Sequence, residues 1–255
     1  MARKDEGFYQ ESVVAERYAS SRPEYPVELF EFLAELAPSK SLAWDCATGN
    51  GQAARRLSEN FEKVVATDHS AEQLRRATSG DRKNIEYRVA EAEQSGLELG
   101  TIDLVTVAQA VHWFDLSSFY EEVSRVLKSG GLIAVWCYRR PKVNSIIDRI
   151  VYKLWHEAER PDPIQLVEEE YASLRFPFEE VAVPSFTISV KWDCNRFVEY
   201  LSTWKWIAET RTAQSTPNEN RLFQELASFW GAAERDVEWD LFIRAGRVAG
   251  PASLD

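Results

Sequence analysis

The sequence has few cysteines and no long apolar run, and each absence excludes a class of protein. Its three cysteines, Cys46, Cys137 and Cys194, show no CxxC spacing, so we expect neither a disulfide framework nor a zinc site. We interpret them as small buried side chains in a reducing compartment. The N-terminal residues lack the apolar stretch of a secretion signal, and no later run reaches the length of a membrane span. We therefore expect a cytoplasmic protein that binds neither a metal ion nor a membrane.

Positive charge is also scarce. The chain has 30 lysines and arginines against 41 aspartates and glutamates, which gives a net charge of −11. The basic residues form short, scattered pairs, and without a basic stripe so acidic a chain repels a phosphate backbone. We expect a small molecule as partner and no nucleic acid, and the sequence leaves the oligomeric state open. The 255 residues suffice for a large core that needs no disulfide or metal.

Helical patterns and short apolar runs alternate through the first half of the chain. Two helices are predicted first, at about 9–19 and 26–36, and apolar runs follow at 41–46, 64–67, 85–89, 102–109 and 132–138. This alternation indicates βαβ units, a parallel sheet and ligands at the carboxyl ends of the strands. Capping boxes at Ser70 with Gln73 and at Ser118 with Glu121 mark two helix starts, and the second helix is predicted to stop at Gly130.

From about residue 141 the regular alternation ends. Helices are predicted at 144–159, 164–174, 196–209 and 219–233, and strands at 186–192 and 237–244. We expect these last strands to form a mixed edge of the sheet that helices cover. The predicted fold is therefore α/β and Rossmann-like, with a mixed seven-stranded sheet, helices on both faces and a helical cap.

A glycine loop follows the first strand and leads into a helix. Gly49 and Gly51 allow close approach of a ligand to the backbone, and Asp68 ends the second strand in a position to accept both hydroxyls of a ribose. These features favour nucleoside binding over a plain turn with a surface aspartate. The residues 49–54 also fit the pattern G-x-G-x-x-A, so an NAD-dependent enzyme remains an alternative.

Five segments in order carry a resemblance to a known family. They are Arg22-Pro-Glu-Tyr-Pro26, Asp45-x-Ala-x-Gly-x-Gly51, Val65-Ala-Thr-Asp-His-Ser70, Ala90-Glu-Ala-Glu93 and Ala108-Gln-Ala-Val-His-Trp-Phe-Asp115. Together they resemble class I S-adenosylmethionine-dependent methyltransferases, in the small-molecule branch of the trans-aconitate methyltransferase-like proteins. The resemblance covers nearly the whole chain, and its most specific motifs lie within 18–140. It implies one methyltransferase domain over 1–255, with N-terminal helices or a lid at 1–40, a cofactor-binding core at 41–140, and cap helices with the last strands at 141–255.

The resemblance also implies which residues bind S-adenosylmethionine. The methionine part would be held by Asp45, Ala47, Gly49 and Gly51, and the ribose and adenine by Asp68, His69, Glu91 and Ala92. Ala108 and Gln109 would lie near the sulfonium, while Tyr18 and Arg22 would contact the cofactor carboxylate or close the site as a lid. Two positions depart from the family pattern. Ala47 replaces a glycine, which is tolerated if its φ is negative, and Glu91 stands where aspartate is usual.

The chemistry needs few residues, because a sulfonium methyl is already activated and alignment supplies most of the rate. His112 follows the fourth strand and is our candidate base; the alternative is a structural histidine hydrogen-bonded by Asp115 or a backbone carbonyl. A carboxylate acceptor would need no base. Trp113, Tyr138 and Trp204 are the candidate acceptor contacts, although packing explains most aromatic residues.

Two missing motifs narrow the acceptor. The fourth strand is not followed by Asn/Asp-Pro-Pro-Tyr/Phe, and no Pro-Cys supplies a cytosine-methylase nucleophile. We predict methyl transfer to a small organic acceptor, most simply to a carboxylate or hydroxyl oxygen. The alternatives are carbon methylation of the quinone type, an NAD-dependent oxidoreductase and a non-catalytic nucleotide-binding protein.

Overall fold

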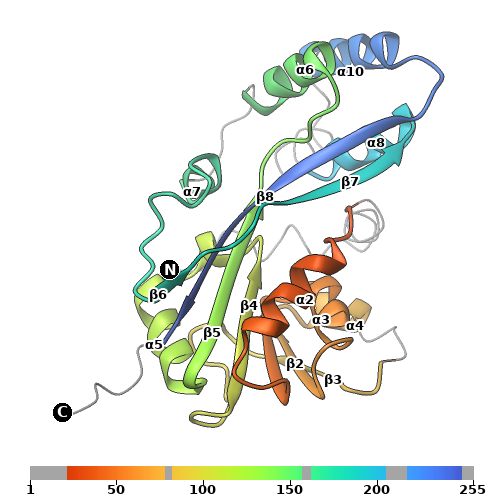
Figure 1. Ribbon diagram of the computed structural model, residues 1–255. Helices are drawn as coiled ribbons and strands as arrows, with labels where there is room; N and C mark the ends of the chain where they lie inside the picture. Colours follow the sequence, from red (N-terminus) through yellow and green to blue (C-terminus); the bar gives the residue numbers. More distant parts are fainter. Residues whose placement is uncertain (1–21, 78–81, 157–161, 205–216, 249–255) are drawn as a thin grey trace. The chain divides into compact units, whose positions relative to one another are not determined.

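The structure, a computed structural model, describes residues 22–77, 82–156, 162–204 and 217–248 (Figure 1). The predicted helix at 9–19 lies outside the described residues. The chain divides into two compact units. The sheet unit comprises Tyr25–Tyr138, Pro163–Phe186 and Leu241–Asp255, and the helical unit comprises Met1–Glu24, Arg139–Asp162 and Thr187–Asp240. The prediction of a single domain over 1–255 stays a prediction.

The sheet unit is built from alternating strands and helices. Its elements are α2 (Val27–Leu36), β1 (Leu42–Cys46), α3 (Gln52–Leu57), β2 (Lys63–Asp68), α4 (Ala71–Ala77), β3 (Ile85–Val89), β4 (Ile102–Ala108), η2 (Val111–Trp113), α5 (Leu116–Val126), β5 (Leu127–Tyr138), α7 (Ile164–Glu168), β6 (Glu179–Val181) and the end of β8 (Arg235–Arg247). The apolar runs thus predicted the first four strands to within one residue at each end, whereas β5 begins five residues before the predicted run at 132–138. β6 is too short to give a sequence pattern.

The sheet is mixed, as predicted. Seven strands follow the order β3-β2-β1-β4-β5-β8-β6, and β7 (Phe186–Trp192) pairs with β8 beside this path. The strands β1 to β5 are mutually parallel, whereas β8 runs antiparallel to both β5 and β6. The chain order reverses between β1 and β4, which is the point in an open parallel sheet where ligands bind.

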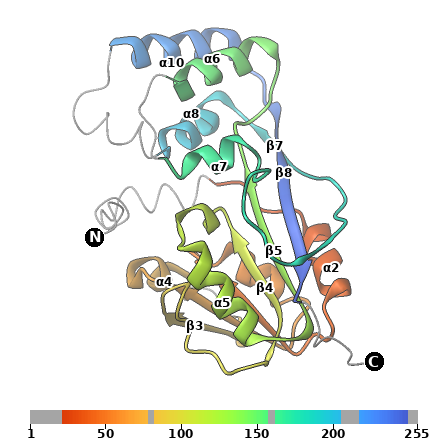
Figure 2. The same ribbon diagram turned by 90° about the vertical axis from the view of Figure 1, so that its left-hand side faces the viewer.

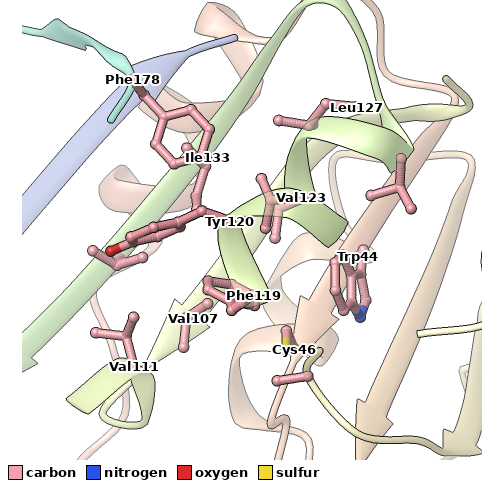
Figure 3. Packing of buried hydrophobic residues seen from close by; sticks show 14 of the residues in the cluster. Trp44, Cys46, Val107, Val111, Phe119, Tyr120, Val123, Leu127, Ile133 and Phe178 are labelled. Atoms are coloured by element: carbon pink, nitrogen blue, oxygen red, sulfur yellow. The ribbon is translucent and has the colours of Figure 1, made fainter. Parts of the chain in front are cut away.

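Helices cover both faces of the sheet because successive side chains of a strand point to opposite faces. On β5, Ile133 and Val135 belong to the apolar cluster that contains Phe119 of α5 (Figure 3). Trp136, the residue after Val135 on β5, lies on the other face and meets Phe30 of α2 edge-on, with ring centroids 6.0 Å apart. Figure 2 shows β4 and β5 between α5 and α2. The rings and branched side chains of these two layers form the core of the unit.

Two helix boundaries differ from the sequence prediction. At α4 the Gln73 amide donates to Ser70 Oγ at 3.3 Å, which confirms that cap. At α5 the predicted cap on Ser118 is wrong, because Asp115 caps the helix and accepts the Ser118 amide at 3.1 Å. An aspartate side chain is at least as good a cap as a serine, so the helix begins two residues before Ser118. The same helix ends at Val126, and the chain enters β5 before Gly130.

The helical unit contains α6 (Ser145–His156), α8 (Cys194–Ser202), α10 (Pro217–Trp230), most of β7 and the first part of β8. Both views show α6 and α10 side by side (Figure 1, Figure 2). Inside the unit, the Trp155 ring meets the Trp204 ring edge-on at 4.8 Å, and Trp239 Nε1 donates to the Tyr200 hydroxyl at 3.0 Å. Aromatic packing therefore holds this unit together. Among the described helices, none is long and apolar enough to cross a membrane.

One predicted helix is much shorter than expected. The pattern at 164–174 indicated a helix throughout, but α7 ends at Glu168. Glu170 and Tyr171 adopt left-handed backbone conformations, with φ of 59° and 60°. Apolar periodicity alone does not reveal this turn, because neither residue is a glycine. The predicted helix at 196–209 is confirmed as far as Ser202, and residues 205–209 lie outside the described residues.

Candidate functional site

The candidate site lies in the sheet unit, at the carboxyl ends of its parallel strands. Asp45 and Asp68 stand at or next to the ends of β1 and β2, and Ala108 ends β4. Since β1 pairs with both β2 and β4, the three strand ends are neighbours at one edge of the sheet. The structure thus brings together the chain segments that the sequence marked as the nucleotide site.

The glycine loop after β1 has an unusual backbone. Ala47, Gly49 and Gly51 all have positive φ, at 53°, 56° and 81°. The condition under which alanine would be tolerated here, a negative φ, is therefore not met, and Ala47 adopts a left-handed conformation in place of the family's glycine. A non-glycine residue in this conformation costs about 1–2 kcal/mol. The loop retains it because the Thr48 amide donates to the Thr67 carbonyl at 2.9 Å and the Gly51 amide to the Thr48 carbonyl at 2.9 Å.

Gly49 and Gly51 have different surroundings. A Cβ added to Gly51 would lie 2.7 Å from the Tyr87 hydroxyl and 3.2 Å from the Ala77 Cβ, so a side chain here would force its neighbours to shift. A Cβ added to Gly49 would meet no atom within 4 Å, so the space beside Gly49 is open to a ligand. Gly51 also precedes α3 directly, at its N-terminal cap position.

Asp68 ties the loop to the second strand. Its Oδ2 accepts the Gly49 amide at 2.8 Å and its Oδ1 accepts the Ser70 amide at 2.8 Å. The side chain is largely buried, and this burial raises the pKa of Asp68 above its ordinary value. The neighbouring His69 ring is exposed, with Nδ1 3.5 Å from Asp68 Oδ1. Each carboxylate oxygen has two lone pairs, so both can still accept a ligand hydroxyl.

Asp45 is buried beneath the same loop. Thr48 Oγ1 donates to its Oδ2 at 2.5 Å, and Thr106 Oγ1 of β4 donates to its Oδ1 at 2.8 Å. Burial nevertheless outweighs these bonds, and the charge of Asp68 adds to the effect, so the pKa of Asp45 rises to about 6. Neither Thr48 nor Thr106 was predicted as a partner of Asp45. The sequence did contain a signal for Thr106, because it is a polar residue in the otherwise apolar second half of β4. Buried polar groups are usually hydrogen-bonded, so a polar partner for Thr106 was to be expected.

The segment after β4 turns sharply. Gln109 has a φ of 58°, its amide donates to the Trp136 carbonyl at 2.9 Å, and its Nε2 donates to the Tyr138 carbonyl at 3.4 Å. These bonds fix Ala108 and Gln109 at the strand end, beside β5. Tyr138 itself is buried, and its ring lies 6.4 Å from that of Tyr25.

His112 lies on the short helix η2 and is 8% exposed. Its Nδ1 is 2.9 Å from the Tyr171 hydroxyl, and its ring centroid lies 5.1 Å from that of Trp113. Asp115, which the structural alternative named as a partner, caps α5. No sequence pattern pointed to Tyr171, which is 59 residues from His112 along the chain.

The remaining predicted site residues lie in three places. Glu91 and Ala92 follow β3 in the sheet unit, Glu91 exposed and Ala92 buried, with Glu91 bridged to Gln94. Arg22 and Trp204 belong to the helical unit, where the Arg22 guanidinium lies 5.2 Å from the Tyr200 ring centre and Trp204 is buried. Tyr18 lies outside the described residues. In the described ranges no group of three His, Cys, Asp or Glu side chains is placed to hold a metal ion.

Comparison with known proteins identifies the family. The family model described as a methyltransferase domain matches residues 44–135, which span the strand ends described above. A proposed methyltransferase of Dictyostelium discoideum is 33% identical over 199 residues, which cover 75% of this chain and 74% of the relative. The chain belongs to the methyltransferase family.

Further matches agree with this assignment. A solved structure of a proposed type II methyltransferase from Anaeromyxobacter dehalogenans has a TM-score of 0.82 and 35% identity, covering 90% of this chain and 99% of that one. A proposed S-adenosylmethionine-dependent methyltransferase of Saccharomyces cerevisiae is 31% identical over 133 residues, or 49% of this chain and 45% of the relative. The protein is an S-adenosylmethionine-dependent methyltransferase with a Rossmann-like fold, and the NAD alternative loses its basis.

The site of this methyltransferase fits its cofactor on structural grounds. The open side of Gly49 leaves room for a ligand against the loop backbone, and the Asp68 carboxylate beside it keeps acceptor capacity for hydroxyl groups. Both lie at the point where the strand order reverses.

Proposed function

We propose that this methyltransferase acts on an oxygen atom of a small organic acceptor, a carboxylate or a hydroxyl. The observation that carries the proposal is the buried His112 imidazole, which lies on the short helix η2 just after β4 ends at Ala108 and has its Nδ1 2.9 Å from the Tyr171 hydroxyl. A neutral imidazole held at this strand end has a ring nitrogen suited to take the proton of a hydroxyl acceptor. The net charge of −11 supports a small acceptor over a nucleic acid.

The chain's own residues divide the work of binding. We assign the ribose hydroxyls to Asp68, with His69 against the adenine and Glu91 with the Ala92 backbone at the adenine edge. Gly49 and Gly51 let the loop backbone approach the methionine part. Asp45 supports the loop from below, because its two carboxylate oxygens accept hydrogen bonds from the hydroxyls of Thr48 and Thr106. Ala47 belongs to the same loop, and Ala108 with Gln109 faces the reacting end of the cofactor.

When bound, S-adenosylmethionine supplies an activated methyl group. The residues around it align the acceptor oxygen, exclude water and receive a proton. Transfer of that methyl group to the acceptor oxygen would leave the electron pair of the C–S bond on sulfur, so a proton is all that the protein residues would have to receive. For a hydroxyl acceptor, Nε2 of His112 takes the proton; a carboxylate has none to give. Our candidates for acceptor contacts remain Trp113, Tyr138 and Trp204. Our candidates for the cofactor carboxylate remain Arg22 and Tyr18.

The experiment is an acceptor screen with S-adenosylmethionine that carries a CD3 group. Carboxylic acids, phenols, quinols, amines and a short duplex DNA are incubated with the enzyme, and products are located by tandem mass spectrometry. A methyl ester or methyl ether supports the proposal, and esters are recognised because mild base cleaves them. Label found only on carbon, on nitrogen or on DNA would overturn it.

A variant separates the role of His112 from the choice of acceptor. With a phenol acceptor, His112→Gln should lower kcat by about 100-fold, in the range for a general base, and leave the affinity for S-adenosylhomocysteine unchanged. With a carboxylic acid acceptor the same variant should keep most of its activity. If the variant is fully active on phenols, His112 is a structural residue and not the base. That result does not contradict methylation of an oxygen atom, which the acceptor screen tests separately.

A further inference from the structure

Tyr171 contacts His112 although the two residues are 59 positions apart in the sequence. The residue follows α7, its side chain is fully buried, and its hydroxyl lies 2.9 Å from His112 Nδ1. Nothing in the sequence pattern marks it. A hydrogen bond to one ring nitrogen decides which nitrogen of a neutral imidazole carries the proton.

The backbone that delivers this hydroxyl is strained. Glu170 and Tyr171 are two successive non-glycine residues with φ near 60°, and each costs about 1–2 kcal/mol. Such strain persists only where the surroundings enforce it, and it concentrates at functional sites. Here the Tyr171 amide donates to the Leu166 carbonyl at 2.8 Å, and Arg244 Nη1 donates to the carbonyls of Tyr171 and Leu174. The turn is therefore held from both sides.

The hydroxyl has a second partner. It hydrogen-bonds the thiol of Cys137 on β5, and burial raises the pKa of Tyr171 well above its ordinary value. The hydroxyl therefore keeps its proton. A hydroxyl has one proton to donate and two lone pairs to accept with. If it donates toward the Cys137 sulfur, its oxygen is left as an acceptor for Nδ1–H of His112.

We propose that Tyr171 is a positioning residue that accepts Nδ1–H of His112 and thereby keeps Nε2 of the neutral ring free of a proton. The Nε2 lone pair is then available to the acceptor hydroxyl. This inference rests on the proposed function of His112 as the base. Tyr171 does not touch the acceptor; it acts through the imidazole.

The test is nitrogen NMR of the histidine rings at a pH where they are neutral. The chain has only three histidines, and the signal lost in His112→Gln assigns the ring of interest. In the unaltered enzyme we expect the pattern of a ring protonated at Nδ1. In Tyr171→Phe this preference should be lost, and kcat on a phenol should fall by about 10-fold, as expected for one net hydrogen bond, with KM and S-adenosylhomocysteine affinity unchanged.

Tyr120→Phe is the matched control. Tyr120 is buried in the same apolar cluster, but its hydroxyl has no hydrogen-bond partner among the described residues. Its removal should change neither the ring spectrum nor kcat. Cys137→Ala provides a second test should Tyr171→Phe fold poorly, since a hydroxyl without its sulfur partner is free to donate to Nδ1. That variant should move the ring toward the form protonated at Nε2.

The outcomes separate the inference from the function on which it rests. If His112→Gln is inactive on phenols while Tyr171→Phe keeps both the ring pattern and kcat, the inference is wrong and the base role stands. A ring protonated at Nε2 in the unaltered enzyme would also overturn the inference. If His112→Gln is fully active on phenols, the base role fails, and the positioning role fails with it.

Discussion

Replacement of Asp45 by asparagine should make this enzyme more stable and bind its cofactor less tightly. Asp45 is 1% exposed, and burial raises its pKa from an ordinary 3.8 to about 6. A carboxyl whose pKa is raised by folding is easier to protonate in the folded state, so its ionised form opposes folding. The cost grows as the pH rises from about 3.8 to about 6 and is constant above that range.

The size of the effect follows from the pKa difference. The pKa of Asp45 is about 2 pH units higher in the folded state than its ordinary value. Because a pKa difference of 1 is worth about 1.4 kcal/mol, the ionised carboxylate opposes folding by about 3 kcal/mol. Asparagine has nearly the same shape and no charge, but its amide group must meet one threonine hydroxyl as a donor. Thr48 or Thr106 can rotate to accept it, and we allow about 1 kcal/mol for the weaker geometry. The expected gain at pH 8 is therefore about 2 kcal/mol, or roughly 4–8 °C in Tm.

Thermal unfolding at pH 8 and pH 5 tests this reasoning, because the electrostatic part of the gain should fall to about half at pH 5. Asp103→Asn is the control. Asp103 is also buried, but it accepts hydrogen bonds from Ser39, from two backbone amides and from Lys128 Nζ, the last at 2.7 Å. Its substitution should cost about 1–3 kcal/mol. An Asp45→Asn enzyme that is no more stable than the parent at pH 8, or whose advantage is equal at both pH values, would refute the argument. Its affinity for S-adenosylhomocysteine should fall, because the loop loses its charged anchor.

Two further predictions concern the cofactor loop. Asp68→Asn should weaken S-adenosylhomocysteine binding in calorimetry by about 1–3 kcal/mol, since charge-assisted bonds to the ribose are lost; an unchanged affinity would remove the ribose assignment. Gly49→Ala should lower stability by only about 1 kcal/mol, which is the cost of its positive φ. It should nevertheless weaken cofactor binding at least about 10-fold, because the added Cβ would occupy the open space that we assign to the cofactor. Gly51→Ala should show the reverse balance, with the larger loss in Tm, because its Cβ would clash with Tyr87; equal losses of Tm in the two variants would contradict this.

Much of the fold was predictable because its signals are local. A buried parallel strand is an apolar run, as in β1, β2 and β4. The glycine loop and Asp68 were also predictable, since a turn with positive φ, a helix start and a strand end are close together in sequence. The errors had local causes too. Asp115 competed with Ser118 for the same cap, and the left-handed turn at Tyr171 uses residues that rarely adopt that conformation.

The sequence by itself determined where the first five strands lie along the chain, the position of the cofactor loop and the residue types that line it. Periodicity, capping and glycine placement depend on only a few neighbouring residues, so they can be recognised in the sequence without knowledge of the tertiary structure. Only the tertiary structure decided which side chains hold that loop and the candidate base. Thr106 meets Asp45 across 61 residues of sequence, and Tyr171 meets His112 across 59. Such pairs form because the sheet brings neighbouring strands and the chain beyond α7 to the same strand ends, and no local pattern records that proximity.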